Sequence, residues 1–202
     1  DRIPVREGLI HSQNCITVRV GMEVGLAKFA DRIQDLGIAK AEVVQQSPTS
    51  FIGSFSSSVA EITRAFTIFR LNGHLTPKLH IIERIEGEEG APIYTAPKAS
   101  RPLARATASN LTRDCLAKVF TEGTAKHAKQ TGRDWIGKTG TTNGARDNWF
   151  VGSDPQFTCG VWVGCDIPTT LHGASGGKFA LPLWVRIMQE APTKNELVQS
   201  KR

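Results

Sequence analysis

The sequence lacks the features of a membrane span and of a metal site. No apolar run among its 202 residues approaches the roughly 20 residues that a membrane-spanning helix needs. No signal peptide is visible at Asp1. None of the 4 cysteines has a metal-ligand spacing such as Cys-x-x-Cys. We therefore expect a domain that holds no metal and uses no cofactor.

Dense basic runs are missing as well. The net charge is +6 and the isoelectric point is about 9.4, but lysines and arginines are scattered and aromatic residues do not alternate with them. We therefore expect no nucleic-acid partner, and we interpret the charge as solubility with a mild attraction to anionic partners. A content of 40% hydrophobic and 22% charged residues is typical of a soluble globular protein. The length suffices for one domain with a sizeable core.

The cysteines are Cys15, Cys115, Cys159 and Cys165. Cys159 and Cys165 lie on one predicted strand, six residues and about 20 Å apart. A disulfide needs Cα atoms within about 7 Å, so these two do not pair with each other. A bridge between other pairs stays open. The default expectation is that the cysteines are small buried hydrophobic residues, and cysteine usage does not settle the compartment.

The most informative stretch runs from Gly137 to Gly152. Asn143-Gly144 in its middle is a strong turn signal, because both residues tolerate a positive φ. The residues Trp149-Phe150-Val151 have the aromatic and β-branched content of a strand. The stretch therefore predicts two strands joined by a tight polar connection.

Lys138, Thr139, Gly140 and Thr141 lie on the first of these strands. In a regular strand the two threonines share one face and Lys138 points from the other. Gly140 has no side chain, so another backbone can approach closely there. This combination suits an extended peptide laid along a strand edge, with main-chain pairing for affinity and Lys138 for a terminal charge. An ordinary surface strand is the alternative.

A second motif, Ser12-Gln13-Asn14, follows the apolar face of a short predicted helix that contains Leu9 and Ile10. By itself a Ser-x-Asn sequence is common and forms a local cap or turn. Its context here is Leu-Ile-His-Ser-Gln-Asn-Cys-Ile-Thr-Val-Arg-Val-Gly, followed by a helix that ends in Leu-Gly-Ile.

These strings resemble one family. Gly-Lys-Thr-Gly-Thr-Thr-Asn, followed by Arg-Asp-x-Trp-Phe-x-Gly, closely resembles class A penicillin-binding proteins, and Lys-Thr-Gly is a known motif of penicillin-binding proteins and class A β-lactamases. The run around Ser12 is similar to the second motif of these transpeptidases, and Gly123-Thr124-Ala125 also matches the family. The resemblance implies a D,D-transpeptidase that cross-links peptidoglycan stem peptides through a serine ester and is acylated by penicillins. It further implies attachment to the inner membrane, facing the periplasm or cell wall.

The resemblance also implies roles for six residues. Ser12 would relay protons near the nucleophile, and the backbone N–H of Thr141 would contribute to the oxyanion hole; these are the catalytic residues. Asn14 would hydrogen-bond the substrate, and Lys138 and Thr139, beside Gly140, would hold the terminal carboxylate of a D-Ala-D-Ala peptide or of a β-lactam.

The nucleophile of this family stands in a helical Ser-x-x-Lys, in which lysine is one turn from serine. The sequence contains Ser-x-x-Lys only at Ser175–Lys178, with two glycines inside it and on the wrong side of Lys-Thr-Gly. Glycine is poor in a helix interior, so we reject Ser175 as the nucleophile. We expect the nucleophile, the membrane anchor and the glycosyltransferase domain of class A members upstream of Asp1.

The expected fold is α+β, an antiparallel sheet flanked by helices like that of β-lactamases and transpeptidases. We assign residues 1–192 to the C-terminal part of a transpeptidase domain and residues 193–202 to a polar tail. Ser58 opens a helix through a capping box with Glu61. The expected strands are the Lys-Thr-Gly strand, Trp149–Gly152 and Phe157–Cys165. The expected helices are Glu23–Leu36, which Gly37 ends, a helix after Ser58, Thr107–Thr121 and Phe179–Ala191. A hairpin is expected around residues 86–90.

Two alternatives remain at this point. A serine β-lactamase shares Lys-Thr-Gly and Ser-x-Asn but lacks the longer string, and hydrolysis of a β-lactam within seconds would favour it. A non-enzymatic module that senses β-lactam or peptidoglycan would also fit, because the chain contains no nucleophile motif. A Ser-x-x-Lys within about 60 residues upstream would favour the transpeptidase.

Overall fold

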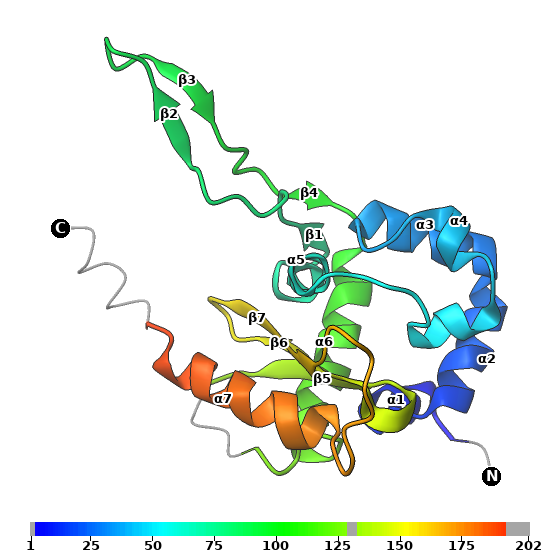
Figure 1. Cartoon of the computed structure of the whole chain (residues 1–202). Helices are drawn as coiled ribbons and strands as arrows, with labels where there is room; N and C mark the ends of the chain where they lie inside the picture. The colour runs from blue at the N-terminus through cyan, green and yellow to red at the C-terminus, as the bar shows by residue number, and fades with distance from the viewer. Residues whose placement is uncertain (1–2, 129–132, 193–202) are drawn as a thin grey trace.

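The computed structural model describes residues 3–128 and 133–192. Its centre is a three-stranded antiparallel sheet in the order β5-β6-β7, formed by β5 (Ile136–Thr141), β6 (Asp147–Ser153) and β7 (Thr158–Gly164) (Figure 1). The expected α+β class and the sequence of three consecutive strands are confirmed. The turn between β5 and β6 contains Gly144 at φ 70°, as the Asn-Gly signal predicts.

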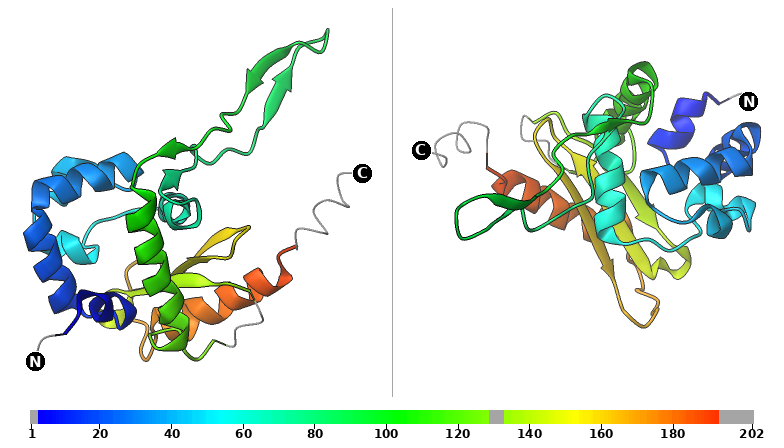
Figure 2. Two further views of the ribbon diagram at one scale, coloured as in Figure 1. Left: turned by 180° about the vertical axis from the view of Figure 1, so that it is seen from behind. Right: turned by 90° about the horizontal axis from the view of Figure 1, so that it is seen from above.

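Helices cover both faces of this sheet (Figures 1 and 2). Helices α5 (Val59–Arg70) and α6 (Ala106–Thr121) pack on one face, where Phe66 and Leu116 meet Ile136 and Val151. Helix α7 (Leu181–Glu190) packs on the other face, where Trp184 lies 5.0 Å from the ring of Phe150. The sheet is therefore the middle layer of three, and consecutive residues of β5 face different helices.

The N-terminal quarter is helical. It consists of α1 (Val5–Ile10), α2 (Asn14–Val24), α3 (Leu26–Leu36), α4 (Ala41–Val44) and the 3-10 turn η1 (Pro48–Ile52). The predicted helix Glu23–Leu36 starts too early, because Gly25 at φ 89° separates α2 from α3. Gly37, in the left-handed region at φ 71°, ends α3 as expected.

The segment before Ser58 contains the 3-10 turn η1, and its Phe51 is buried against Phe29, with 5.1 Å between the ring centroids. The capping box is confirmed, since the N–H of Glu61 donates to Ser58 Oγ at 3.2 Å and the N–H of Ser58 donates to the Glu61 carboxylate at 2.8 Å.

A hairpin projects from the body of the domain (Figure 1). It is formed by β2 (Arg84–Glu86) and β3 (Pro92–Thr95), and a short pair, β1 (His74–Leu75) with β4 (Arg101–Pro102), joins it to the body. The predicted hairpin is confirmed, although residues 79–82 before it are not in a strand.

Some large apolar residues of the predicted helices Thr107–Thr121 and Phe179–Ala191 are on the surface. Leu111, Leu183 and Ile187 are 69%, 49% and 49% exposed. In α6 the buried side runs through Ser109, Leu116 and Phe120, and at 3.6 residues per turn Leu111 lies on another side. The default expectation of buried cysteines is wrong for Cys15 and Cys165, which are exposed, and all four cysteines are free.

Among the residues described, no helix combines the length and apolar character needed to cross a bilayer. Within the same residues, no group of three or more acidic, histidine or cysteine side chains is arranged to hold a metal ion. The proposed polar tail, residues 193–202, lies outside the part of the chain that is described.

Candidate active site

Lys138 and Ser12, 126 residues apart in the sequence, are brought together by β5 and the loop between α1 and α2. Lys138 Nζ donates to Ser12 Oγ at 2.8 Å and to the carbonyl oxygen of Thr139 at 3.1 Å. Ser12 has φ 57°, a left-handed conformation that is uncommon for a residue other than glycine. Strained residues of this kind cluster at functional sites, and the hydroxyl of Ser12 is in contact with the lysine.

The ammonium group of Lys138 is partly withdrawn from water. Burial lowers the pKa of Lys138 from 10.5 to about 8, because the charged form loses hydration and, among the residues described, gains no acidic partner. A lysine with such a pKa exists in both protonation states near neutral pH. In contact with a hydroxyl, it has the chemistry of a proton donor and acceptor.

The two threonines of the strand face the other side of the sheet. Thr139 Oγ1 lies 2.7 Å from Thr124 Oγ1, in the turn after α6. Thr141 Oγ1 accepts a hydrogen bond of 2.9 Å from the N–H of Gly176. The expected alternation is therefore present, with Lys138 on one face and both threonine hydroxyls on the opposite face.

Gly140 is the point of a close backbone approach, as expected, and the partner is Gly176. A Cβ added to Gly176 would lie 2.5 Å from the carbonyl oxygen of Gly140 and 2.3 Å from that of Trp149. No side chain fits at such distances. The Gly-rich segment before α7 therefore supports the end of β5 from one side.

The outer edge of β5 has backbone groups that point away from β6. The N–H of Thr142 donates to the carbonyl oxygen of Asp147 at 3.0 Å. Hydrogen-bonded and non-hydrogen-bonded pairs alternate along an antiparallel ladder, so the N–H groups of Thr141 and Thr139 point away from β6. The carbonyl of Thr139 points the same way, which explains why it is available to Lys138. In the part of the chain described, β5 has no second neighbouring strand.

Asp147 holds the connection after this strand, a role that the sequence did not reveal. Its carboxylate accepts hydrogen bonds from the Thr142 hydroxyl at 2.9 Å and from the Trp162 indole N–H at 3.0 Å. The N–H of Asp147 in turn donates to Thr142 Oγ1 at 2.9 Å. The hydrogen bonds between Thr142, after β5, and Asp147, at the start of β6, thus fix the tight connection between the two strands.

The structure brings together five of the six predicted residues: Ser12, Lys138, Thr139, Gly140 and Thr141. The sixth, Asn14, is the first residue of α2 and is exposed. Among the described residues, no hydrogen bond ties its side chain to β5. Thr124 and Gly176 are additional residues at the site. Gly-Thr-Ala and the Gly-rich string are visible in the sequence, but nothing in the sequence connects either of them to the Lys-Thr-Gly strand.

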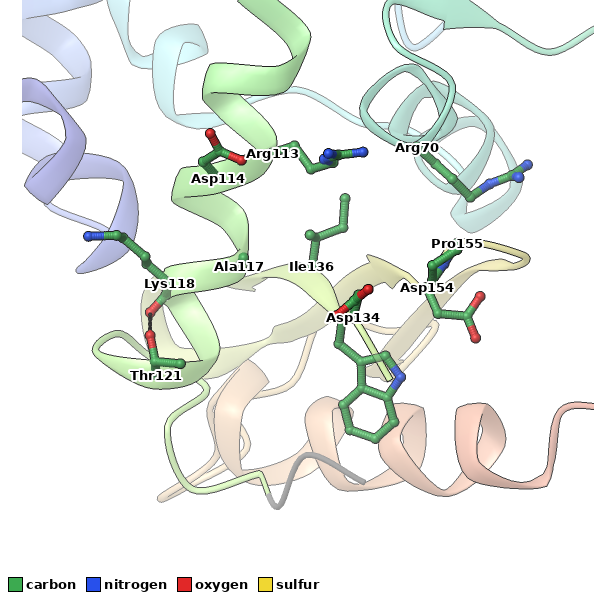
Figure 3. Close-up of a pocket in the computed structure, with 11 residues that line it drawn as sticks. Arg70, Arg113, Asp114, Ala117, Lys118, Thr121, Asp134, Ile136, Asp154 and Pro155 are labelled. Atoms are coloured by element: carbon green, nitrogen blue, oxygen red, sulfur yellow. Dashed lines mark hydrogen bonds between the residues drawn. The ribbon is translucent and has the colours of Figure 1, made fainter. Parts of the chain in front are cut away.

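A hollow of about 480 Å³ lies elsewhere, between α6, the end of α5 and the turn from β6 to β7 (Figure 3). Arg70, Arg113 and Asp154 line it, and the cations and carboxylates around it are mixed. It contains none of the predicted site residues, so the chemistry described above is at a strand edge, apart from this hollow.

Comparison with known sequences identifies relatives over almost the whole chain. Residues 1–189 match the model of the family described as "Penicillin binding protein transpeptidase domain". The chain is 32% identical to penicillin-binding protein 1A of Rickettsia bellii, over 94% of this chain and 26% of the relative. It is also 32% identical to penicillin-binding protein 1A of Neisseria cinerea, over 94% of this chain and 24% of the relative. The chain thus spans about a quarter of the length of these relatives.

Solved structures show the same fold. Penicillin-binding protein 1A from Haemophilus influenzae superposes with a TM-score of 0.78 at 23% identity, over 94% of this chain and 35% of that one. The imipenem acyl-enzyme complex of penicillin-binding protein A from Mycobacterium tuberculosis superposes with a TM-score of 0.72 at 15% identity, over 94% and 48%. At these sequence identities the superpositions show only that the fold is shared. The assignment to a family rests on the match of residues 1–189 to the family model. The chain therefore belongs to the penicillin-binding protein transpeptidase domain family.

Proposed function

We propose that this chain is part of a peptidoglycan D,D-transpeptidase that cross-links stem peptides by serine acyl transfer. The observation that carries the proposal is the hydrogen bond of 2.8 Å between Lys138 Nζ and Ser12 Oγ, made beside an open strand edge. Acyl transfer from a serine ester must move a proton off the nucleophile and onto a leaving amine. A lysine with a pKa of about 8 in contact with a serine hydroxyl is suited to that transfer.

The substrate would lie along β5. Its main chain would pair with the outward backbone groups of Thr139 and Thr141. Its terminal carboxylate would be held by Lys138 and Thr139, and Asn14 would hydrogen-bond the peptide from the start of α2. The carboxylate of a penicillin would occupy the same place, so β-lactams are expected partners.

The oxyanion formed during acyl transfer needs N–H donors placed in advance. We assign one donor to the backbone N–H of Thr141, supported by the ladder alternation that turns it outward. Removal of one such donor typically costs about 10²–10³ in rate. The second donor and the nucleophilic serine would come from a part of the protein outside this chain.

Ser175 does not have the environment of a nucleophile. Its side chain caps the turn η3 (Gly176–Ala180) by accepting from the N–H of Lys178, and Lys178 Nζ donates to the carbonyl oxygen of Gly173 at 3.4 Å. Among the described residues, no lysine side chain makes a hydrogen bond to Ser175 Oγ, so none is in place there as its base. We propose instead a helical Ser-x-x-Lys upstream.

The proposed cell location is the inner membrane, with this domain facing the periplasm or cell wall. Support comes from the family resemblance, and the anchor would be supplied by another part of the protein. Location can be checked by fractionation of cells that express the whole protein with a tag.

The function is tested on the whole protein that contains this chain. Incubation with a labelled penicillin should give a stable covalent adduct on an upstream serine, and a D-Ala-D-Ala donor with an amine acceptor should give a cross-linked product. No adduct at all would refute the proposal. Rapid turnover of the adduct, with β-lactam hydrolysis within seconds, would favour the β-lactamase alternative instead.

A further inference from the structure

The turn after α6, residues 123–125, contacts both the end of α1, which precedes Ser12, and β5, which contains Thr139. Gly123 packs against the end of α1: a Cβ added there would lie 2.3 Å from the carbonyl oxygen of Ile10, two residues before Ser12. Ala125 is fully buried in the cluster that includes Trp135 and Trp184. The turn is thus fixed on both sides of Thr124.

Thr124 points at the strand of the site. Its Oγ1 lies 2.7 Å from Thr139 Oγ1, and within the described residues this is the one hydrogen bond of the Thr124 hydroxyl. Its carbonyl oxygen supports the Gly-rich segment, since a Cβ added to Gly177 would lie 3.2 Å from it. Thr124 therefore contacts the residue proposed to hold a carboxylate but is not itself on the open edge.

Which of the two hydroxyls donates the hydrogen bond decides whether Thr139 has a proton left to donate to a carboxylate. A hydroxyl has one proton to donate and two lone pairs to accept with, whereas a carboxylate has only acceptors. If Thr139 donated to Thr124, it would meet the carboxylate without a proton. If Thr124 donates to Thr139, the proton of Thr139 is free for the carboxylate, and the two hydrogen bonds strengthen each other.

We infer that Thr124 is a positioning residue that acts through Thr139. Its hydroxyl donates to Thr139 Oγ1, and this orients the Thr139 proton toward the anionic end of the donor peptide or of a β-lactam. The inference rests on the proposed function, and it adds a residue that determines how well the site recognises a carboxylate.

The test uses the whole protein with Thr124→Val, which keeps the shape of threonine and removes the hydroxyl. The second-order rate constant of acylation by benzylpenicillin should fall about threefold to tenfold, the range expected for loss of one hydrogen bond. Thr124→Ser, which keeps the hydroxyl, should restore most of the rate. Thr121→Val, which changes an exposed threonine at the end of α6, is the matched control and should acylate at the parental rate.

A double-mutant cycle separates positioning from structural damage. In a Thr139→Val background, Thr124→Val should cause no further loss, because the hydroxyl through which Thr124 acts is gone. Additive losses, or an unchanged rate in the single variant, would overturn the inference. If the parent protein forms no adduct, the proposed function fails; if the parent acylates and the cycle is additive, the inference alone fails. Thermal unfolding of each variant shows whether a loss of rate reflects a loss of fold.

Discussion

Replacement of Lys138 by methionine should make the protein more stable and less active. The pKa of Lys138 is lowered from 10.5 to about 8 by burial, so the folded site disfavours the charged side chain. At about 1.4 kcal/mol per pKa unit, this penalty reaches about 3 kcal/mol at most. The side chain keeps some contact with solvent, so we expect a gain of about 1–3 kcal/mol in the free energy of unfolding at pH 7. Methionine fits because it is unbranched and adaptable.

The gain should depend on pH with a defined sign. The folded pKa lies below the unfolded one, so between about pH 8 and 10.5 the unfolded state binds more protons. The stability of the parent protein therefore rises with pH in this window. Lys138→Met lacks the titration, so its advantage is full below pH 8 and disappears as the pH rises through 10.5.

Urea unfolding at pH 7, 8.5 and 10 measures this difference, with the exposed Lys126→Met as the control. The same preparations should be acylated by penicillin at least ~10-fold more slowly than the parent, because a charge-assisted contact of about 1.5–3 kcal/mol is lost. Lys138→Arg should also be slow, since a planar fork does not replace a point charge. If the parent and Lys138→Met are equally stable at pH 7, or if their difference in stability does not change with pH, burial does not lower the pKa of Lys138. A parental acylation rate in the folded variant would refute the role of Lys138.

Three further outcomes are expected. Ser12→Ala should slow acylation about 100-fold or more without lowering the unfolding temperature, because Ser12 is exposed; an unchanged rate would remove Ser12 from the proton path. Gly176→Ala should cost about 1–3 kcal/mol of stability and reduce acylation, since its Cβ would meet two carbonyl oxygens at 2.3 and 2.5 Å. Gly177→Ala is the control and should cost less stability, because the nearest contact of its Cβ is at 3.2 Å. Equal losses for the two variants in urea unfolding would contradict this account. The 202-residue chain alone should show no penicillin adduct by intact-mass spectrometry, whereas an adduct on Ser175 would overturn our rejection of that serine.

The local elements followed from the sequence because short-range chemistry sets them. Ser58 and Glu61 make their capping box within one turn, and Gly37 and Gly144 adopt the positive φ values that their positions require. The order of the three strands was likewise predictable, since short connections join consecutive antiparallel strands. The burial of single residues is decided by tertiary packing, since the apolar Leu111 of α6 is on the exposed side of its helix.

The motif residues of the site, and the family to which they point, were readable from the sequence. Their mutual geometry was not, because it depends on contacts between residues far apart in the chain. The end of α1, which packs against the turn after α6, brings Ser12 to Lys138, and burial in the folded chain lowers the pKa of the lysine. The turn after α6 also places Thr124 against Thr139, a contact between common residues with no sequence signature. The sequence by itself determined which groups are present; the tertiary structure decided which of them share a proton or a hydrogen bond, since these interactions require atoms within about 3 Å.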